Sequence, residues 1–237
     1  MYTLSLTDLF FAFIPVLLVL IIMIYKSLQY KTALYALARM LLQLLLIGYF
    51  LIYIFKAESS WIVLATLSVM LLVASWIALR IVKDQKALYF KALLSIGIGG
   101  GFTLILITQF VLELQPWYQP SYMIPLAGMI FANAMTAISL AAERFELGLS
   151  AGTPNNQAST EAFNTALIPV INGLFAVGLV SLPGMMTGQI LSGVSPLIAA
   201  RYQIMVMAMI FSASGLSVLL FLQLIKHNFA STRNNDV

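Results

Sequence analysis

The chain has 237 residues, of which 62% are hydrophobic and 8% are charged, and its formal net charge is +4. A soluble globular domain carries about 25% charged residues, so this composition excludes a water-soluble fold. It predicts an all-α, polytopic bundle of transmembrane helices in a lipid bilayer, with residues 1–237 forming a single transmembrane domain. The basic residues lie in short gaps between apolar runs, which favours topology signals over a nucleic-acid-binding surface.

The apolar runs, taken in chain order, predict about seven membrane spans separated by charged residues and turn residues. We expect these spans at residues 8–25, 33–55, 60–81, 91–112, 122–142, 166–190 and 201–225. With the N-terminus outside, ten of the twelve basic residues fall on the inner side. They are Lys26, Lys31, Arg39, Arg80, Lys83, Lys86, Lys91, Arg144, Lys226 and Arg233, which leaves Lys56 and Arg201 outside. This bias predicts an outer N-terminus and an inner C-terminus.

Several kinds of catalytic site are excluded by what the sequence lacks. There is no cysteine, and the single histidine, His227, builds neither a zinc site nor a histidine-based triad. No lysine stands in the G-x-x-x-x-G-K-[ST] pattern of a phosphate-binding loop. We therefore expect no catalytic residues and no cofactor in this chain, so any ATP hydrolysis would belong to a partner.

Two stretches depart from the pattern of spans and short loops. Residues 143–165, on the predicted inner side, are polar and form the only sizeable internal surface that a partner protein could use. Residues 181–195 carry Pro183 and three glycines within an otherwise apolar run. Such a break is tolerated in a bilayer only where it is buried in protein or lines a wet cavity, so it is a candidate gate.

Polar side chains inside the spans allow more than one interpretation. Arg39 either snorkels to the inner interface or contacts a buried partner or a substrate. The amides Gln43, Asn133, Asn172, Gln189 and Gln203 either bond between helices or bind a ligand. Met185 and Met186 are either ordinary apolar residues or ligands for a soft metal ion, so no metal site is certain. The eight carboxylates fall near span ends or in loops, which argues against a proton-coupled or sodium-coupled carrier.

Glycine pairs four residues apart predict close helix approaches. Gly97 and Gly101 lie within an apolar run with no strand before them, which favours helix packing over a nucleotide-binding loop. Gly184 and Gly188 have the same spacing and fit either helix packing or a hinge.

Three segments resemble one transporter family. Glu146 and Gly152 have the spacing of the E-A-A-x-x-x-G coupling loop of ABC permeases. Residues 172–210, NGLFAVGLVSLPGMMTGQILSGVSPLIAARYQIMVMAMI, are similar to the signature of the Fet-type iron-export permeases, a family that includes plant aluminium-tolerance subunits. RMLLQLLLIGYFLIYIF at 39–55 and MIPLAGMIFANAMTAISL at 123–140 extend the resemblance over most of the chain. The inner loop departs from the family pattern, because a longer charged helix is shortened here to ELGLSAGTPNNQA at 146–158.

The resemblance implies a permease domain of an ABC transporter in the inner (plasma) membrane, exporting iron or a related solute. Two copies would form the pathway, and a separate ATPase carrying ATP and Mg would power it. The coupling loop would comprise Glu143, Arg144, Glu146, Gly152, Pro154 and Gln157. The substrate pathway or gate would draw on Arg39, Gln43, Asn133, Asn172, Pro183, Gly184, Met185, Met186, Thr187, Gly188, Gln189, Arg201 and Gln203.

Two other functions remain open from the residues alone. The chain could be a stand-alone channel or secondary carrier that needs no ATPase, or a subunit that assembles with a transporter without moving solute itself. The substrate is equally open among iron, another metal, a metal chelate and a sugar nucleotide.

Overall fold

A computed structural model describes residues 5–55, 59–82 and 84–234, without the side chains of Leu6 and of 227–234. The predictions that concern Lys56, Lys83 and the side chains of His227 and Arg233 lie outside this description. The chain divides into two compact units, Met1–Ala57 and Glu58–Val237. That residues 1–237 form one domain stays a prediction.

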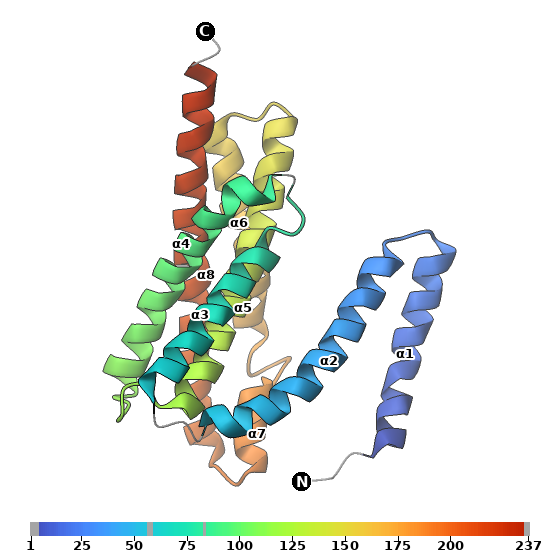
Figure 1. Cartoon of the computed structure of the whole chain (residues 1–237), viewed down its shortest axis with the longest axis vertical. Coiled ribbons are helices and arrows are strands. Elements are labelled where there is room, and N and C mark those ends of the chain that lie inside the picture. Colours follow the sequence, from blue (N-terminus) through green and yellow to red (C-terminus); the bar gives the residue numbers. More distant parts are fainter. Residues whose placement is uncertain (1–4, 56–58, 83, 235–237) are drawn as a thin grey trace. The chain divides into compact units, whose positions relative to one another are not determined.

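The described residues are almost entirely helical (Figure 1). The elements are α1 (Leu6–Tyr25), α2 (Tyr30–Phe55), α3 (Ser60–Ala78), α4 (Gln85–Ile105), the π-helical turn η1 (Leu106–Val111), α5 (Pro120–Ser150), α6 (Asn155–Ala176), α7 (Gly184–Leu191) and α8 (Pro196–Asn234). In the described residues, the β-type pairing is one isolated bridge between Val177 and Ser181, in the segment between α6 and α7. The predicted all-helical architecture is confirmed for this part of the chain.

The first unit is a hairpin of α1 and α2, whose first helix begins at a capping box. The Asp8 amide donates to the Ser5 hydroxyl oxygen at 3.2 Å, and the Ser5 amide donates to the Asp8 carboxylate at 2.8 Å. These bonds satisfy amide groups that the start of a helix leaves without partners. Asp8 therefore caps a helix end, as expected of a carboxylate outside the middle of a span.

The second unit is a bundle in which α8 packs against α4, α5, α6 and α7. α5 packs in turn against α3, α4 and α6, and contributes the largest share of the buried residues. Side chains such as Ile96, Ile130 and Phe221 are completely buried between these helices. Figure 1 shows α6 and α7 together returning the chain from the end of α5 to the start of α8.

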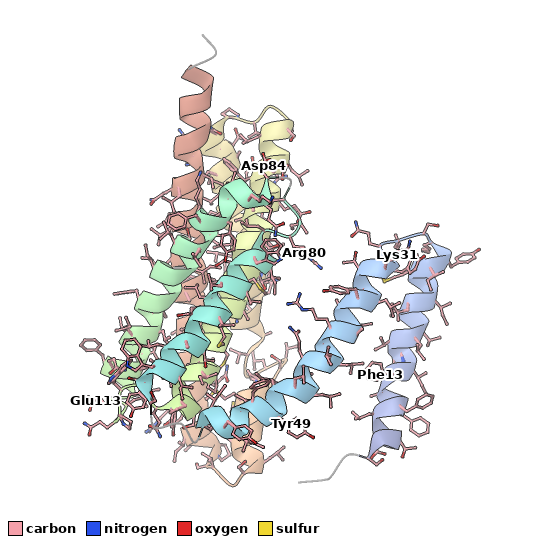
Figure 2. The ribbon with its side chains drawn as sticks, in the orientation of Figure 1. Phe13, Lys31, Tyr49, Arg80, Asp84 and Glu113 are labelled. Carbon is pink, nitrogen blue, oxygen red and sulfur yellow. The ribbon has the colours of Figure 1, made fainter. Side chains whose placement is uncertain are left out.

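One end of the bundle gathers the polar connections. Arg80 and Asp84 lie at this end and Glu113 at the opposite one (Figure 2). A common groove is lined by Asp84, Lys91, Glu146 and Ile225, so the last turns of α5 and the part of α8 around Ile225 meet the α3–α4 connection and the start of α4 there. Arg80 and Lys91 therefore lie at the same end of this unit, while the side of the membrane that this end faces stays a prediction.

Six helical stretches in the described ranges are long and apolar enough to cross a membrane, rather than the seven predicted. They are Thr7–Tyr25, Tyr30–Phe55, Ser60–Ala78, Gln85–Val111, Pro120–Ser150 and Pro196–Lys226. The span expected at 166–190 is divided between α6 and α7, which a non-helical turn at 177–183 separates. The break that was predicted at 181–195 is therefore present, but the helix already ends at Ala176, and much of the predicted stretch is the helix α7.

The close helix approach in α4 involves a different glycine pair from the one predicted. A Cβ atom on Gly101 would meet no described atom within 4 Å, and one on Gly97 would make an ordinary contact with Leu71 at 3.4 Å. On Gly99 it would lie 2.8 Å from the Ser217 backbone nitrogen, and on Gly100 2.8 Å from an Ile130 methyl carbon. The predicted pair was wrong because spacing alone does not say which face of a helix meets its neighbours.

Candidate functional site

The polar segment at 143–165 is a helical hairpin rather than a loop with one short helix. α5 continues to Ser150 and α6 begins at Asn155, which leaves a turn of 151–154. With 31 residues, α5 is about 46 Å long, whereas the hydrocarbon core of a bilayer is about 30 Å thick. The polar last turns of α5 and first turns of α6 therefore have the length to project beyond the membrane.

Gly152 ends α5 with a backbone conformation that other residues adopt at a cost. Its φ of +80° lies in the left-handed region. The Thr153 amide donates to the Gly148 carbonyl at 3.0 Å, and the Gly152 amide donates to the Leu149 carbonyl at 3.0 Å. This pair of bonds is a Schellman motif, which satisfies carbonyls at a helix end and reverses the chain. Pro154 then caps the start of α6.

Side chains hold the two arms of the hairpin together. An Arg144 guanidinium nitrogen on α5 lies 2.6 Å from a Glu161 carboxylate oxygen on α6. Gln157 donates from its amide to the other oxygen of Glu161 at 3.0 Å. Nearer the turn the helices meet closely, because a Cβ atom on Gly148 would lie 3.1 Å from the Ala158 Cβ. Helix packing and an ion pair therefore both join α5 to α6 in the hairpin.

A groove of about 400 Å³ lies beside the hairpin, between α4, α5 and α8. Its walls carry Asp84, Lys91 and Glu146 next to apolar side chains that include Leu88 and Leu149. This end of the second unit therefore combines a projecting helical hairpin with a recess that has charges of both signs.

The segment between α6 and α7 departs from helical structure at residues 177–183. Gly178 has a φ of +85°, and its amide donates to the Ser181 carbonyl at 3.0 Å. Leu179 and Val180 are 92% and 84% exposed at the tip of this turn. Pro183 then caps α7, and the Thr187 hydroxyl donates to the Leu182 carbonyl at 3.4 Å.

A cavity of about 510 Å³ lies between the end of α6, α7 and α8. Met186 of α7 and Gln203 and Met207 of α8 are among its lining residues. Gln203 is only 5% exposed, and its side-chain oxygen has no hydrogen-bond partner among the described atoms. Gln189 on α7 has a similarly enclosed side-chain oxygen with no such partner, although it does not line this cavity.

Comparison with known proteins identifies the family of this chain. Residues 6–230 match a family described as "Uncharacterised protein family (UPF0014)". The chain belongs to the UPF0014 family. The resemblance of residues 172–210 is confirmed, because the relatives of this chain include the probable iron export permease protein FetB of Escherichia coli (strain K12) and the protein ALUMINUM SENSITIVE 3 of Arabidopsis thaliana. Together with the six apolar helices in the described part of the chain, this membership makes the UPF0014 chain a multi-pass membrane protein.

The relatives cover most of this UPF0014 chain. FetB is 33% identical over 223 residues, which is 87% of this chain and 85% of FetB. ALUMINUM SENSITIVE 3 is 36% identical over 223 residues, 87% of this chain and 80% of that protein. The membrane protein slr1647 of Synechocystis sp. is 38% identical over 202 residues, 78% of both chains. No solved structure matches the chain.

The structure of this UPF0014 member brings only some of the predicted pathway residues together. Met186 and Gln203 share the cavity, and Met185, Thr187, Gly188 and Gln189 lie along α7 beside it. Asn133 instead lines a pocket of about 70 Å³ between α5 and α6 and donates to the Met129 carbonyl of its own helix. Asn172 and Arg201 are exposed. Arg39 and Gln43 lie on α2, in the first unit.

Sequence reasoning missed several residues that line the cavity. Met207 and Phe211 lie one and two helical turns beyond Gln203 on the same face of α8, and Leu174 and Val177 complete the wall from α6. Spacing of four residues indicates a shared helix face, so the series 203, 207 and 211 carried a usable signal. The contribution of Leu174 and Val177 depends on tertiary packing and has no such signal.

Proposed function

We propose that this chain is the membrane permease subunit of an ABC exporter, active as a homodimer in the inner (plasma) membrane. A separate ATPase subunit, which binds ATP and Mg, docks on the hairpin formed by the end of α5 and the start of α6. The solute is iron or a related metal or small molecule. Motion of the hairpin is transmitted through α5 and α6 to the break at 177–183 and to α7.

The observation that carries this proposal is the geometry of the hairpin. It is long enough to project from the membrane, its turn is fixed at Gly152, and Arg144 pairs with Glu161 across it. A partner that moves a rigid hairpin also moves the buried faces of α5 and α6, because close-packed helices transmit displacement. The adjoining groove with Asp84, Lys91 and Glu146 offers the same partner polar contacts.

The family relation supports the solute and the direction of transport. FetB is named a probable iron export permease, and this chain covers 85% of its length. Arg80 and Lys91 lie at the end of the bundle that carries Asp84, and Arg144 lies on the hairpin itself, whereas Arg201 lies near the start of α8. An excess of Lys and Arg is typical of cytoplasmic loops, which supports a cytosolic hairpin. A hairpin on the cytosolic side would be accessible to a cytosolic ATPase.

The decisive experiment is transport by the purified chain with and without its ATPase. Tagged protein is purified from its native membrane, and co-purifying chains are tested for a phosphate-binding loop and vanadate-sensitive ATP hydrolysis. Both proteins are then reconstituted in liposomes, and movement of ferrous iron is followed. We expect flux that requires both chains and ATP. Equal flux by this chain alone would instead establish a stand-alone channel or carrier. Equal flux by the ATPase with other co-purifying membrane chains, in the absence of this chain, would leave it only a role in assembly.

A second experiment tests where the hairpin lies. Because the chain has no cysteine, Ser150→Cys introduces a single thiol near the hairpin turn, and Glu113→Cys introduces one at the other end of the bundle. A membrane-impermeant maleimide added to intact cells should label Glu113→Cys, and Ser150→Cys only after the membrane is opened. The reverse pattern would place the hairpin outside and refute the docking proposal.

A further inference from the structure

The turn between α1 and α2 carries positive charge without a neighbouring carboxylate. Lys26 and Lys31 flank this four-residue turn with exposed side chains, and Figure 2 labels Lys31 there. Residues 9–55 contain these two lysines and Arg39 but no Asp or Glu. Asp8 caps the opposite end of α1, about 27 Å from Lys26 along the helix axis. Among the described residues, neither lysine has an ion-pair partner.

Several basic residues of the second unit lie close to carboxylates instead. Arg144 pairs with Glu161 across the α5–α6 hairpin. Lys91 shares a groove with Asp84 and Glu146. A carboxylate beside a positive charge weakens the attraction for other anions, because the two fields oppose each other. The α1–α2 turn therefore keeps an attraction for anions that these residues of the second unit largely lose.

The length of α1 places this turn at a membrane surface. The 20 residues of the helix span about 30 Å, which is the thickness of the hydrocarbon core of a bilayer. Near the turn, Tyr25 and Tyr35 are 88% and 66% exposed, and exposed tyrosines are typical of the membrane–water interface. Lys26 and Lys31 therefore lie at the depth of the lipid phosphate groups.

Arg39 adds a third positive charge that can reach the same surface. It lies about 12 Å beyond Lys31 along α2, in the apolar part of the helix. Side chains of an α-helix lean toward its N-terminus, and α2 begins at the turn. The Arg39 side chain therefore snorkels most readily toward the turn, where a charge costs less than among acyl chains.

A phospholipid fits this turn better than a soluble acidic protein does. The turn has only four residues between two spans, so it does not project beyond the layer of lipid headgroups. α2 has no buried residue, and both helices expose many large apolar side chains. A phospholipid can therefore place its acyl chains against these helices while its phosphate contacts the lysines.

We propose that the α1–α2 turn binds anionic phospholipids, whose headgroup phosphate contacts Lys26 and Lys31 while Arg39 reaches it from within the bilayer. A zwitterionic headgroup such as phosphocholine binds less well, because its quaternary amine is repelled by the same lysines. One basic residue near an anionic membrane surface contributes roughly a 5-fold preference. The inference is independent of the proposed export function and of the side of the membrane that the turn faces.

Quenching of a fluorescent label by lipids tests this preference. Because the chain has no cysteine, Gln29→Cys provides a single thiol in the turn for the uncharged fluorophore bimane. Thr7→Cys provides a matched position beside Asp8 at the other end of α1. Each labelled full chain is placed in phosphatidylcholine nanodiscs that contain a small fraction of nitroxide-labelled phosphatidylglycerol or of nitroxide-labelled phosphatidylcholine.

The two labels should report different lipid surroundings. At residue 29 we expect quenching that corresponds to a roughly 5-fold local enrichment of phosphatidylglycerol over phosphatidylcholine. At residue 7 phosphatidylglycerol should quench no more than phosphatidylcholine does. Raising the salt concentration to about 1 M should remove most of the enrichment at residue 29, because it shortens the range of the attraction.

Charge variants connect the enrichment to the lysines. Lys26→Gln combined with Lys31→Gln should bring quenching at residue 29 by the two lipids to near equality. The matched control combines Arg80→Gln with Lys86→Gln, which removes the same amount of charge from exposed residues on either side of Asp84. This control should keep the enrichment, because it leaves the α1–α2 turn unchanged.

A single variant tests the third charge. Arg39→Gln should lower the enrichment by a smaller factor than the lysine pair does, and Arg39→Lys should preserve it, because lysine also snorkels. Unchanged enrichment in Arg39→Gln would overturn the contribution of Arg39.

Three results would overturn the lipid site as a whole. The first is equal quenching by both lipids at residue 29 in the chain with its lysines intact. The second is enrichment that survives removal of both lysines, or that is lost equally in the control, since the cause would then be the overall charge of the protein. The third is loss of enrichment on adding inorganic phosphate at constant ionic strength, which would show a site for a soluble anion. None of these measurements uses ATP or a partner chain.

Discussion

Arg144 and Glu161 form an ion pair across the α5–α6 hairpin, with a nitrogen-to-oxygen distance of 2.6 Å and side chains that are 44% and 34% exposed. An exposed pair of this kind contributes about 0.2–1 kcal/mol to stability, so its loss should not unfold the protein. We predict that Arg144→Glu lowers the apparent unfolding temperature in detergent only slightly but strongly reduces ATP-dependent transport, because two facing carboxylates push the arms of the hairpin apart.

The charge-swapped double variant is the control for this prediction. Arg144→Glu combined with Glu161→Arg restores an ion pair of reversed direction and should recover much of the transport. No recovery, with normal membrane insertion, would mean that the ATPase recognises the individual charges rather than the stiffness of the hairpin.

The turn at Gly152 gives a prediction about stability. Its φ of +80° places any side chain at this position under strain, although a Cβ atom there would meet no described atom within 4 Å. Gly152→Ala should therefore destabilise the hairpin by about 1–2 kcal/mol, and Gly152→Asn by less, because asparagine tolerates the left-handed region better. Thermal unfolding of both variants and of the unaltered chain in detergent measures these differences in stability. Equal stability of all three would show that the turn accommodates a side chain without strain.

The glycines of α4 predict effects of opposite sign for the same substitution. A Cβ on Gly99 would lie 2.8 Å from the Ser217 backbone nitrogen, so Gly99→Ala must displace α8 and should cost about 1–3 kcal/mol. Gly101 faces open space, so Gly101→Ala should stabilise the helix by up to about 1 kcal/mol through its higher helix propensity. The free energy of unfolding in a denaturing detergent tests both; destabilisation of the two variants alike would contradict the packing of α4 on α8.

How far the sequence predicts this fold depends on what each signal measures. Hydropathy locates α1 to α5 and α8, because lipid requires long apolar helices. The same measure fails at 143–165, because the last turns of α5 and the first turns of α6 are polar. Two helical arms joined by a short turn therefore have the hydropathy of a loop. Hydropathy also counts 166–190 as one span, since the residues around the break stay apolar. Pro183 signals the break but not its start at Val177.

The candidate site was partly predictable for a related reason. Gln203 stands out in the sequence because an amide within an apolar run needs a hydrogen-bond partner. Met186 stands out because it lies at the predicted break in the helix. The sequence could not show that both line one cavity, or that Asn172 is exposed, because these facts depend on how α6, α7 and α8 pack.

The glycines of α7 provide the test of the gate. A Cβ atom on Gly184 or Gly188 would meet no described atom within 4 Å, so leucine at both positions should leave insertion and unfolding temperature close to those of the unaltered chain. Under the proposed gating, α7 moves into the space beside these glycines, and two leucines would occupy that space. We therefore predict that Gly184→Leu with Gly188→Leu abolishes ATP-dependent solute export from reconstituted liposomes while the partner still binds. The corresponding alanine variant should retain export, because a methyl group leaves most of that space free. Full export by the leucine variant would show that movement of α7 does not gate transport.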